Sequence, residues 1–146
     1  MKIAIAADHA AFTAKGEIIR HLESKGLEVE DLGTKSEESV DYPLYGQKVA
    51  HSVLTKKCDR GIVICGTGIG ISIAANRFKN IRAALCTTKA HAEMARKHNN
   101  SNVLALGARI TEMTIIKDII DVWLYTDFEG GRHQSRIELI DGINND

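Results

Sequence analysis

The sequence predicts an α/β fold in three layers, with a five-stranded parallel sheet between two layers of helices. Two observations lead to this fold class. Short apolar segments recur along the chain, and segments with helical periodicity separate them. This alternation favours a parallel sheet, because each helix serves as the crossover that returns the chain to the same edge of the sheet. The length of 146 residues suits a single domain, which we expect to span residues 1–146.

Each expected strand is short and rich in apolar residues. The segment RGIVIC is strongly apolar, as a buried strand is, whereas LEVEDLG alternates apolar and charged residues, as a half-exposed strand does. The strands are expected over residues 2–6, 27–33, 60–65, 81–86 and 102–107.

The expected helices carry apolar residues three or four positions apart. In residues 111–125, for example, Met113, Ile116, Ile120 and Trp123 fall on one stripe. Whether the tail beyond the Gly130-Gly131 break is helical stays open. The helices are expected over residues 11–25, 44–57, 70–78, 89–99 and 111–125.

Composition limits the class of protein. Lys and Arg together number 19, as do Asp and Glu, so the net charge is zero and gives no general attraction to nucleic acid or an acidic membrane. No apolar stretch approaches the roughly 18 residues of a membrane span. The three cysteines have no disulfide-like spacing, and the N-terminal segment lacks a signal-peptide layout. We therefore expect a cytoplasmic protein.

Three glycines alternate directly after the third expected strand, in the segment GTGIG from Gly66 to Gly70. Glycine lets a ligand approach the backbone closely, and successive N–H groups at the start of a helix bind anions. The spacing differs from the dinucleotide pattern G-x-G-x-x-G and lacks the lysine of a P-loop. We predict a cradle for a small oxyanion, with a ligand-free tight turn as the alternative.

Polar residues also follow two of the strands, where ligands of open α/β sheets bind. Asp8 and His9 can contact a hydroxylated ligand or exchange protons, and Asp8 can also cap the next helix. Cys65 precedes a helix start, which favours a thiolate that acts as base or nucleophile. The alternative for Cys65 is a small buried apolar side chain, which is what we expect of Cys58 and Cys86.

The second half of the chain adds a histidine and three arginines. His98 can interact with the helix dipole as a cation, or act as a general acid near neutral pH. Arg109 follows the fifth strand, and Arg132 and Arg136 share one face if the tail is helical. Paired guanidinium groups suit a phosphate, although a solvated C-terminal helix explains the pair equally well.

No metal site is predicted. His91 and His98 lie seven positions apart, and no Cys/His cluster has metal-ligand spacing. The remaining histidines, His21, His51, His91 and His133, are expected at the surface.

The motifs together resemble the ribose-5-phosphate isomerase B group, which includes the lactose-pathway galactose-6-phosphate isomerase subunits. The resemblance spans nearly the whole chain. It rests on AADHAAF near the start, ESVDYP at 38–43, DRGIVICGTGIGISIAANR at 59–77, RAALC at 82–86, HNNSNVLALGAR at 98–109 and EGGRHQSR at 129–136.

The resemblance implies a Rossmann-like α/β/α domain that interconverts an aldose phosphate and its ketose phosphate, here ribose 5-phosphate and ribulose 5-phosphate of the pentose phosphate pathway. It implies no metal and no cofactor. Cys65 matches the base that moves a proton between C2 and C1 through a cis-enediolate, and His98 matches the group that opens the furanose ring. Thr67 lies beside the reacting end. One branch has Glu after the last glycine, whereas Ile71 here indicates the cysteine branch.

The resemblance also implies a homodimer with shared active sites, sometimes paired into a tetramer. Part of each site comes from the partner, and residues 127–146 are expected to pack on or reach it. The residues that match substrate-binding positions are Asp8, His9, Gly66, Thr67, Gly68, Ile69, Gly70, Asn99, Arg109, Arg132 and Arg136.

Three alternatives remain open from the sequence. The same chemistry can act on galactose 6-phosphate or allose 6-phosphate, because loop shape accommodates one extra carbon. A non-catalytic sugar-phosphate-binding module can share the fold. A signalling receiver with Asp8 as phosphoacceptor is the third, although the lone Asp and the glycine loop argue against it.

Overall fold

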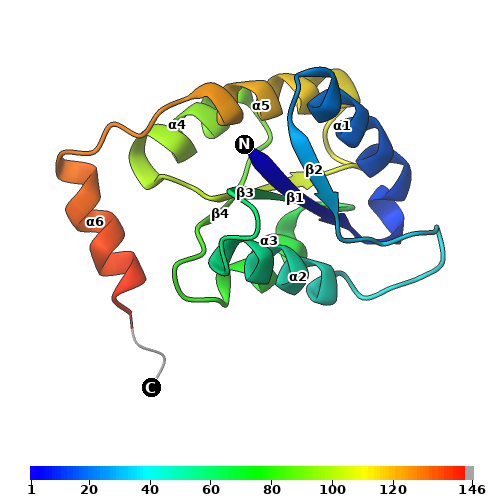
Figure 1. Cartoon of the computed structure of the whole chain (residues 1–146), viewed down its shortest axis with the longest axis horizontal. Coiled ribbons are helices and arrows are strands. Elements are labelled where there is room, and N and C mark those ends of the chain that lie inside the picture. The colour runs from blue at the N-terminus through cyan, green and yellow to red at the C-terminus, as the bar shows by residue number, and fades with distance from the viewer. Residues whose placement is uncertain (144–146) are drawn as a thin grey trace.

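A parallel sheet of five strands forms the centre of the molecule, in the order β2-β1-β3-β5-β4. Figure 1 shows this computed structural model, which describes residues 1–143. The fold class predicted from the sequence is confirmed. The strands are β1 (Lys2–Ala7), β2 (Glu28–Asp31), β3 (Arg60–Cys65), β4 (Ala83–Leu85) and β5 (Val103–Gly107).

Helices cover both faces of the sheet (Figure 1). Alternate residues of each strand point to opposite faces, so each buried strand contributes to two apolar layers. Ile3, Ile5 and Ile62 pack with α1, α4 and α5, whereas Ala4 and Val63 pack with α2 and α3. The helices are the 3-10 helix η1 (His9–Ala11), α1 (Phe12–Ser24), α2 (Tyr42–Leu54), α3 (Ile69–Asn76), α4 (Lys89–Asn99), α5 (Met113–Tyr125) and α6 (Arg132–Asp141).

The chain reverses its direction of travel across the sheet between β1 and β3. From β1 it moves outward to β2, then returns to the other side of β1 to form β3. Ala7 is level with Ile64 and Cys65 is level with Gly107, so the carboxyl ends of β1, β3 and β5 lie side by side. Such a switch point is where open α/β sheets bind ligands. The topology therefore selects the loops after these strands as the candidate site.

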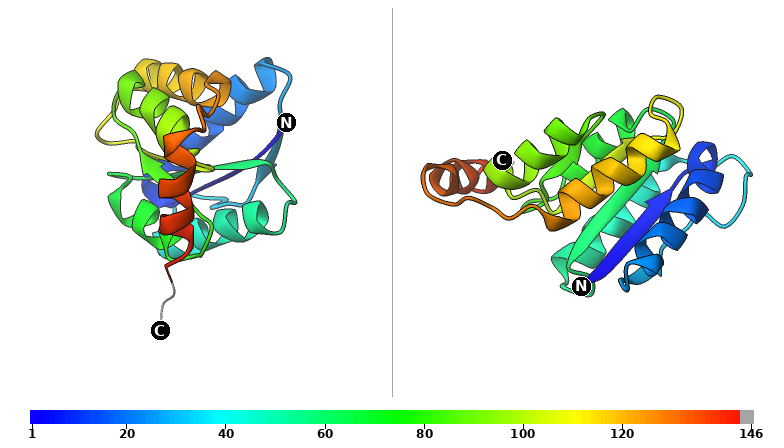
Figure 2. Two further views of the ribbon diagram at one scale, coloured as in Figure 1. Left: turned by 90° about the vertical axis from the view of Figure 1, so that its left-hand side faces the viewer. Right: turned by 90° about the horizontal axis from the view of Figure 1, so that it is seen from above.

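Helix α6 lies apart from the three layers, beyond the β4 edge of the sheet (Figure 2). The tail left open by the sequence is thus helical over Arg132–Asp141. Ile137 is buried, whereas Leu139 keeps 75% of its surface exposed. Arg82, just before β4, forms a 2.7 Å ion pair with Asp141 at the other end of α6. Within residues 1–143, no helix is long and apolar enough to cross a membrane.

Candidate active site

The loop after β1 holds two of the predicted site residues. Asp8 is buried, and one carboxylate oxygen accepts a 3.0 Å hydrogen bond from the amide of Ala10, so it caps η1 as predicted. His9 accepts a 3.1 Å hydrogen bond at Nδ1 from the amide of Val40. A neutral His9 therefore carries its proton on Nε2, where the ring can donate to an oxygen of a ligand.

Glycine is required in the turn between β3 and α3. Gly68 has φ +80°, and a Cβ there would lie 2.5 Å from Leu85 Cδ1 and 2.8 Å from the carbonyl carbon of Leu106. At Gly70, a Cβ would lie 2.4 Å from Cζ of Tyr42. The backbone of the turn is thus pressed against β5 on one side and a phenol ring on the other. Tyr42 was not among the site residues predicted from the sequence, although it lies in the motif ESVDYP.

The thiol of Cys65 faces this turn. Its Sγ accepts a 3.1 Å hydrogen bond from the amide of Gly68, which precedes the first residue of α3, and only 4% of Cys65 is exposed. An amide N–H and a helix N-terminus both stabilise negative charge on sulfur. Burial raises the pKa of Cys86 to about 12 and also raises the pKa of Cys58. They fit the structural role expected of them.

Arg109 and Thr67 complete the group at this edge. The Arg109 amide donates a 2.9 Å hydrogen bond to the carbonyl of Gly66, and a Cβ on Gly66 would lie 3.4 Å from Arg109 Cδ. Thr67 and Ile69 are both exposed, and the Thr67 hydroxyl accepts a 3.2 Å hydrogen bond from the Ile69 amide. A thiol, a guanidinium and a glycine-rich helix start therefore lie close together at this end of the strands, and such groups suit an anionic ligand.

His98 and Asn99 lie at the opposite end of the sheet, where the strands begin. Helix α4 begins after the carboxyl end of β4 and runs back for 11 residues, or about 16 Å at 1.5 Å per residue. It ends beside the amino end of β4, where Arg82 Nε donates a 3.0 Å hydrogen bond to the Asn99 carbonyl. Arg132 and Arg136 are exposed at the start of α6, beside this end of α4. One chain therefore divides the predicted site residues between two places.

His133 is not at the surface, so that prediction was wrong. It is 7% exposed, and its ring stacks on His98 with 4.3 Å between centroids and 17° between planes. Its Nε2 lies 3.5 Å from Oε2 of Glu129. Ile137, one helical turn later, is buried too, and this i, i+4 spacing was the available signal. Among the other histidines, His21 is half-buried beside Asp121, whereas His51 and His91 are exposed.

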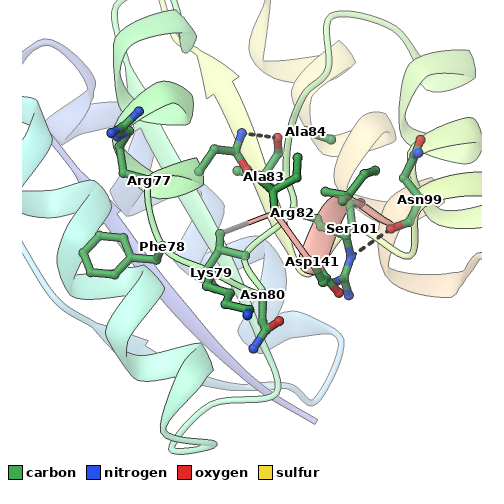
Figure 3. A pocket seen from close by; sticks show the side chains of 14 residues that line it. Arg77, Phe78, Lys79, Asn80, Arg82, Ala83, Ala84, Asn99, Ser101 and Asp141 are labelled. Atoms are coloured by element: carbon green, nitrogen blue, oxygen red, sulfur yellow. Dashed lines mark hydrogen bonds and ion pairs between the residues drawn. The ribbon is translucent and has the colours of Figure 1, made fainter. Parts of the chain in front are cut away.

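A hollow of about 490 Å³ lies next to this second group (Figure 3). Asn99 and Ser101 line one side and Phe78 lines another, and Arg82 crosses it to reach Asp141. None of its lining residues belongs to the glycine turn. The hollow therefore borders the His98 group and not Cys65.

Comparison with known proteins fixes the family. A family model described as Ribose/Galactose Isomerase matches residues 3–140. The chain belongs to this family. The resemblance drawn from the motifs is thus confirmed.

Members of the ribose/galactose isomerase family match this chain over nearly its full length. Ribose-5-phosphate isomerase B of Escherichia coli (strain K12) is 50% identical over 97% of this chain and 95% of its own. A ribose 5-phosphate isomerase from Thermotoga maritima has a solved structure that is 54% identical, with a TM-score of 0.96, covering 97% of this chain and 98% of that one. The Clostridium thermocellum ribose-5-phosphate isomerase B is 52% identical, with a TM-score of 0.96, covering 97% and 96%.

Proposed function

We propose that this chain is an aldose-ketose isomerase that interconverts D-ribose 5-phosphate and D-ribulose 5-phosphate. The observation that carries the proposal is the 3.1 Å hydrogen bond from the Gly68 amide to Cys65 Sγ, at the mouth of a glycine turn that can bind an oxyanion. The family and the names of its full-length relatives support the same reaction. Three free cysteines support a reducing compartment, so we place the enzyme in the cytoplasm.

In this mechanism Cys65 moves one proton. As a thiolate it takes the proton from C2 of the open-chain aldose, and the electron pair of that bond forms the cis-enediolate. The proton on O2 passes to O1, the protonated sulfur returns its own proton to C1, and the carbonyl forms at C2 to give the ketose. The negative charge of the intermediate lies on oxygen, where N–H groups of the segment Gly66–Gly70 stabilise it. Removing one such donor from other enzymes costs about 2.7–4 kcal/mol.

His98 and the arginines serve the substrate before and around this step. His98 transfers a proton between the ring oxygen and the hydroxyl so that the furanose opens. Arg109, Arg132 and Arg136 bind the phosphate, and this remote binding energy positions C1 and C2 against the sulfur. Asp8, His9 and Asn99 contact the sugar phosphate, and Thr67 lies beside the reacting end.

We propose further that two copies of the chain share each site. Cys65 lies at the carboxyl end of its strand and His98 lies near the amino end of β4, so a single chain cannot place both on one sugar. The exposed apolar side chains of Ile69 and Ile73 on α3 and of Leu139 on α6 suit burial between copies. Residues 127–143 would then reach the partner, while residues 144–146 lie outside the described part of the chain. Pairs of such dimers would give the tetramer.

The direct test is conversion of ribose 5-phosphate to ribulose 5-phosphate in excess EDTA, by wild type and Cys65→Ala. Galactose 6-phosphate and allose 6-phosphate are assayed beside it. Turnover of the pentose phosphate that is lost in the variant supports the proposal. Turnover of only a hexose phosphate would contradict the substrate assignment. No turnover of any of the three sugars would favour a binding module instead.

A further inference from the structure

Three side chains with metal-ligand chemistry meet where α4, the segment before α6 and α6 itself come together. His98 ends α4, Glu129 lies in the connecting segment and His133 is in the first turn of α6. One nitrogen or oxygen from each residue lies within 4.8 Å of those from the other two. We propose that these residues form a binding site for a divalent transition metal ion, with Zn²⁺ the best fit, and that the bound ion inhibits the enzyme.

The distances between ligand atoms suit zinc. With bonds of about 2.0–2.1 Å, tetrahedral ligand atoms lie about 3.4 Å apart. His133 Nε2 and Glu129 Oε2 are already 3.5 Å apart. The remaining separations of up to 4.8 Å close by rotation of two side chains, Glu129, which is 50% exposed, and His98. The His98 ring must turn out of its stack on His133, because an imidazole lone pair lies in the plane of its ring and stacked rings do not point at one ion. The buried His133 is the fixed member of the site.

The backbone holds the three residues in place before any ion binds. The Glu129 amide donates a 3.1 Å hydrogen bond to the carbonyl of Lys97, next to His98. The His133 amide donates a 3.1 Å hydrogen bond to the Gly130 carbonyl, which anchors the start of α6. This preorganisation removes part of the entropic cost of assembling ligands from three segments.

The ligand set identifies the class of ion. Two imidazoles and one carboxylate select Zn²⁺ and its neighbours among the first-row metals over Mg²⁺ and Ca²⁺, which prefer oxygen ligands. Three protein ligands leave a fourth position for water or an anion. The sequence search missed the set because the i, i+4 pair Glu129 and His133 needs His98 from another helix.

The local charges both favour and oppose a cation. The C-terminus of α4 carries partial negative charge, and the Glu129 carboxylate adds a full one. Lys97 and Arg132 oppose the ion, although Lys97 is paired with Glu93 at 2.5 Å. We therefore expect reversible binding that a chelator removes, weaker than that of a closed four-ligand zinc site.

Inhibition follows if His98 has the role given above, and this part of the inference rests on the proposed function. An imidazole nitrogen that donates its lone pair to a metal cannot accept and return a proton. The bound ion would thus block ring opening while Cys65 remains intact. Added EDTA would restore the rate.

The test is a titration of metal-stripped protein with Co²⁺, followed by visible absorbance and by calorimetry. Tetrahedral Co²⁺ gives intense visible bands, so the readout does not depend on activity. We expect wild type to bind one ion per chain, and Glu129→Gln and His133→Gln to weaken binding by more than about tenfold, because loss of even an outer-shell partner costs that much. The control is His91→Gln, which removes an exposed histidine from α4, the helix that carries His98. This variant should bind Co²⁺ as wild type does.

Two results would overturn the site. One is equal binding of Co²⁺ by wild type and Glu129→Gln. Because the Glu129 side chain is exposed, a loss of binding in this variant would not be explained by misfolding. The other is loss of binding in Cys65→Ser alone, which would assign the ion to the thiol.

Zn²⁺ inhibition is measured separately, with each variant compared against its own metal-free rate. Lower sensitivity of Glu129→Gln supports the inhibitory role, and equal sensitivity contradicts it. If the protein turns over no sugar phosphate, the proposed function fails, while the Co²⁺ titration still decides whether the metal site exists.

Discussion

The glycine turn after β3 and the junction of α4 with α6 hold their candidate site residues by different means. In the turn, backbone presses against backbone and side chain so closely that Gly68 admits no Cβ. At the junction, one ring stack, one 3.5 Å contact between His133 and Glu129 and a few hydrogen bonds position His98 and His133. The first arrangement is complete within one chain. The second leaves Arg132 and Arg136 exposed, and in the proposed shared site a partner chain would complete it.

Replacing Cys65 by Ala should give the largest effect of any single change. Loss of a positioned base typically lowers a rate by about 10²–10⁴-fold. The matched control is Cys86→Ala, which removes a buried thiol whose pKa is raised to about 12 and which is therefore no base at neutral pH. Steady-state assays on ribose 5-phosphate compare the two. Equal losses in both variants would mean that packing, not the thiolate, limits the rate.

Mixing subunits tests whether the two regions belong to one site. Cys65→Ala and His98→Asn should each be inactive alone. If sites are shared, half the dimers of a random mixture are mixed, and each has one intact site, so about a quarter of wild-type activity returns. The mixture must be unfolded and refolded together to exchange subunits. No recovery, with mixed dimers present by mass spectrometry, would place both residues in the same chain's site.

The two regions also differ in how their glycines respond to substitution. Gly68→Ala and Gly130→Ala both place a side chain at positive φ, +80° and +66° respectively, which costs about 1–2 kcal/mol. Only at Gly68 does the new Cβ also meet backbone atoms, at 2.8–3.0 Å from Leu106, and overpacking adds about 1–3 kcal/mol. Urea unfolding should show the larger loss for Gly68→Ala. Similar losses would show that the turn relaxes more than its contacts suggest.

The same contrast explains what the sequence could predict. Strand β3 and helix α4 match their predicted bounds because their apolar patterns end at clear turn signals. Strand β4 is shorter than the expected 81–86, since the amide of Arg82 bonds to the Asn102 side chain and not to a neighbouring strand. The helix expected over 44–57 begins at Tyr42, because Pro43 is tolerated in its first turn.

Site residues were predictable where they are local in sequence. Cys65 and the glycine turn lie within six consecutive positions at a strand end, so their meeting needs only the strand assignment. The contact of His133 with His98 joins two helices across 35 positions, and no pattern in either helix specifies it. A site shared by two chains cannot be predicted from the pattern of one chain. That expectation came only from the family resemblance.

Thiol labelling provides a milder test of the reaction centre. Cys65 should react with iodoacetamide first among the three cysteines near pH 7, because its sulfur accepts the Gly68 amide, whereas burial raises the pKa of Cys58 and holds that of Cys86 at about 12. Substrate should slow labelling of Cys65. Peptide mass spectrometry assigns the site. Equal labelling of Cys86 would contradict the assigned environments.

The smallest expected effect concerns charge at the carboxyl end of β2. Burial alone would raise the pKa of Asp31, but the Lys15 ammonium, the Gly33 amide and Lys35 together hold it below its usual value. A lowered pKa stabilises the fold above the unfolded value of about 3.9, and this stabilisation is lost as the pH falls through the folded pKa. Asp31→Asn should therefore lower stability at pH 7 and flatten its decline below about pH 4.

The size of that change separates a supporting ion pair from a surface one. Lys15 is almost fully buried and also donates to the Thr34 carbonyl at 2.7 Å, so Asp31→Asn leaves a buried cation with only neutral acceptors. Because the Asp31 side chain is 32% exposed, water softens the loss to about 1–2 kcal/mol at pH 7. Asp118→Asn, which breaks an exposed pair with Lys89, should lower the free energy of unfolding by about 0–1 kcal/mol. It should leave the decline of stability below about pH 4 unchanged. Equal effects of the two variants in urea titrations at pH 7 and pH 3.5 would show that close packing alone, without this ion pair, keeps the loop after β2 in place.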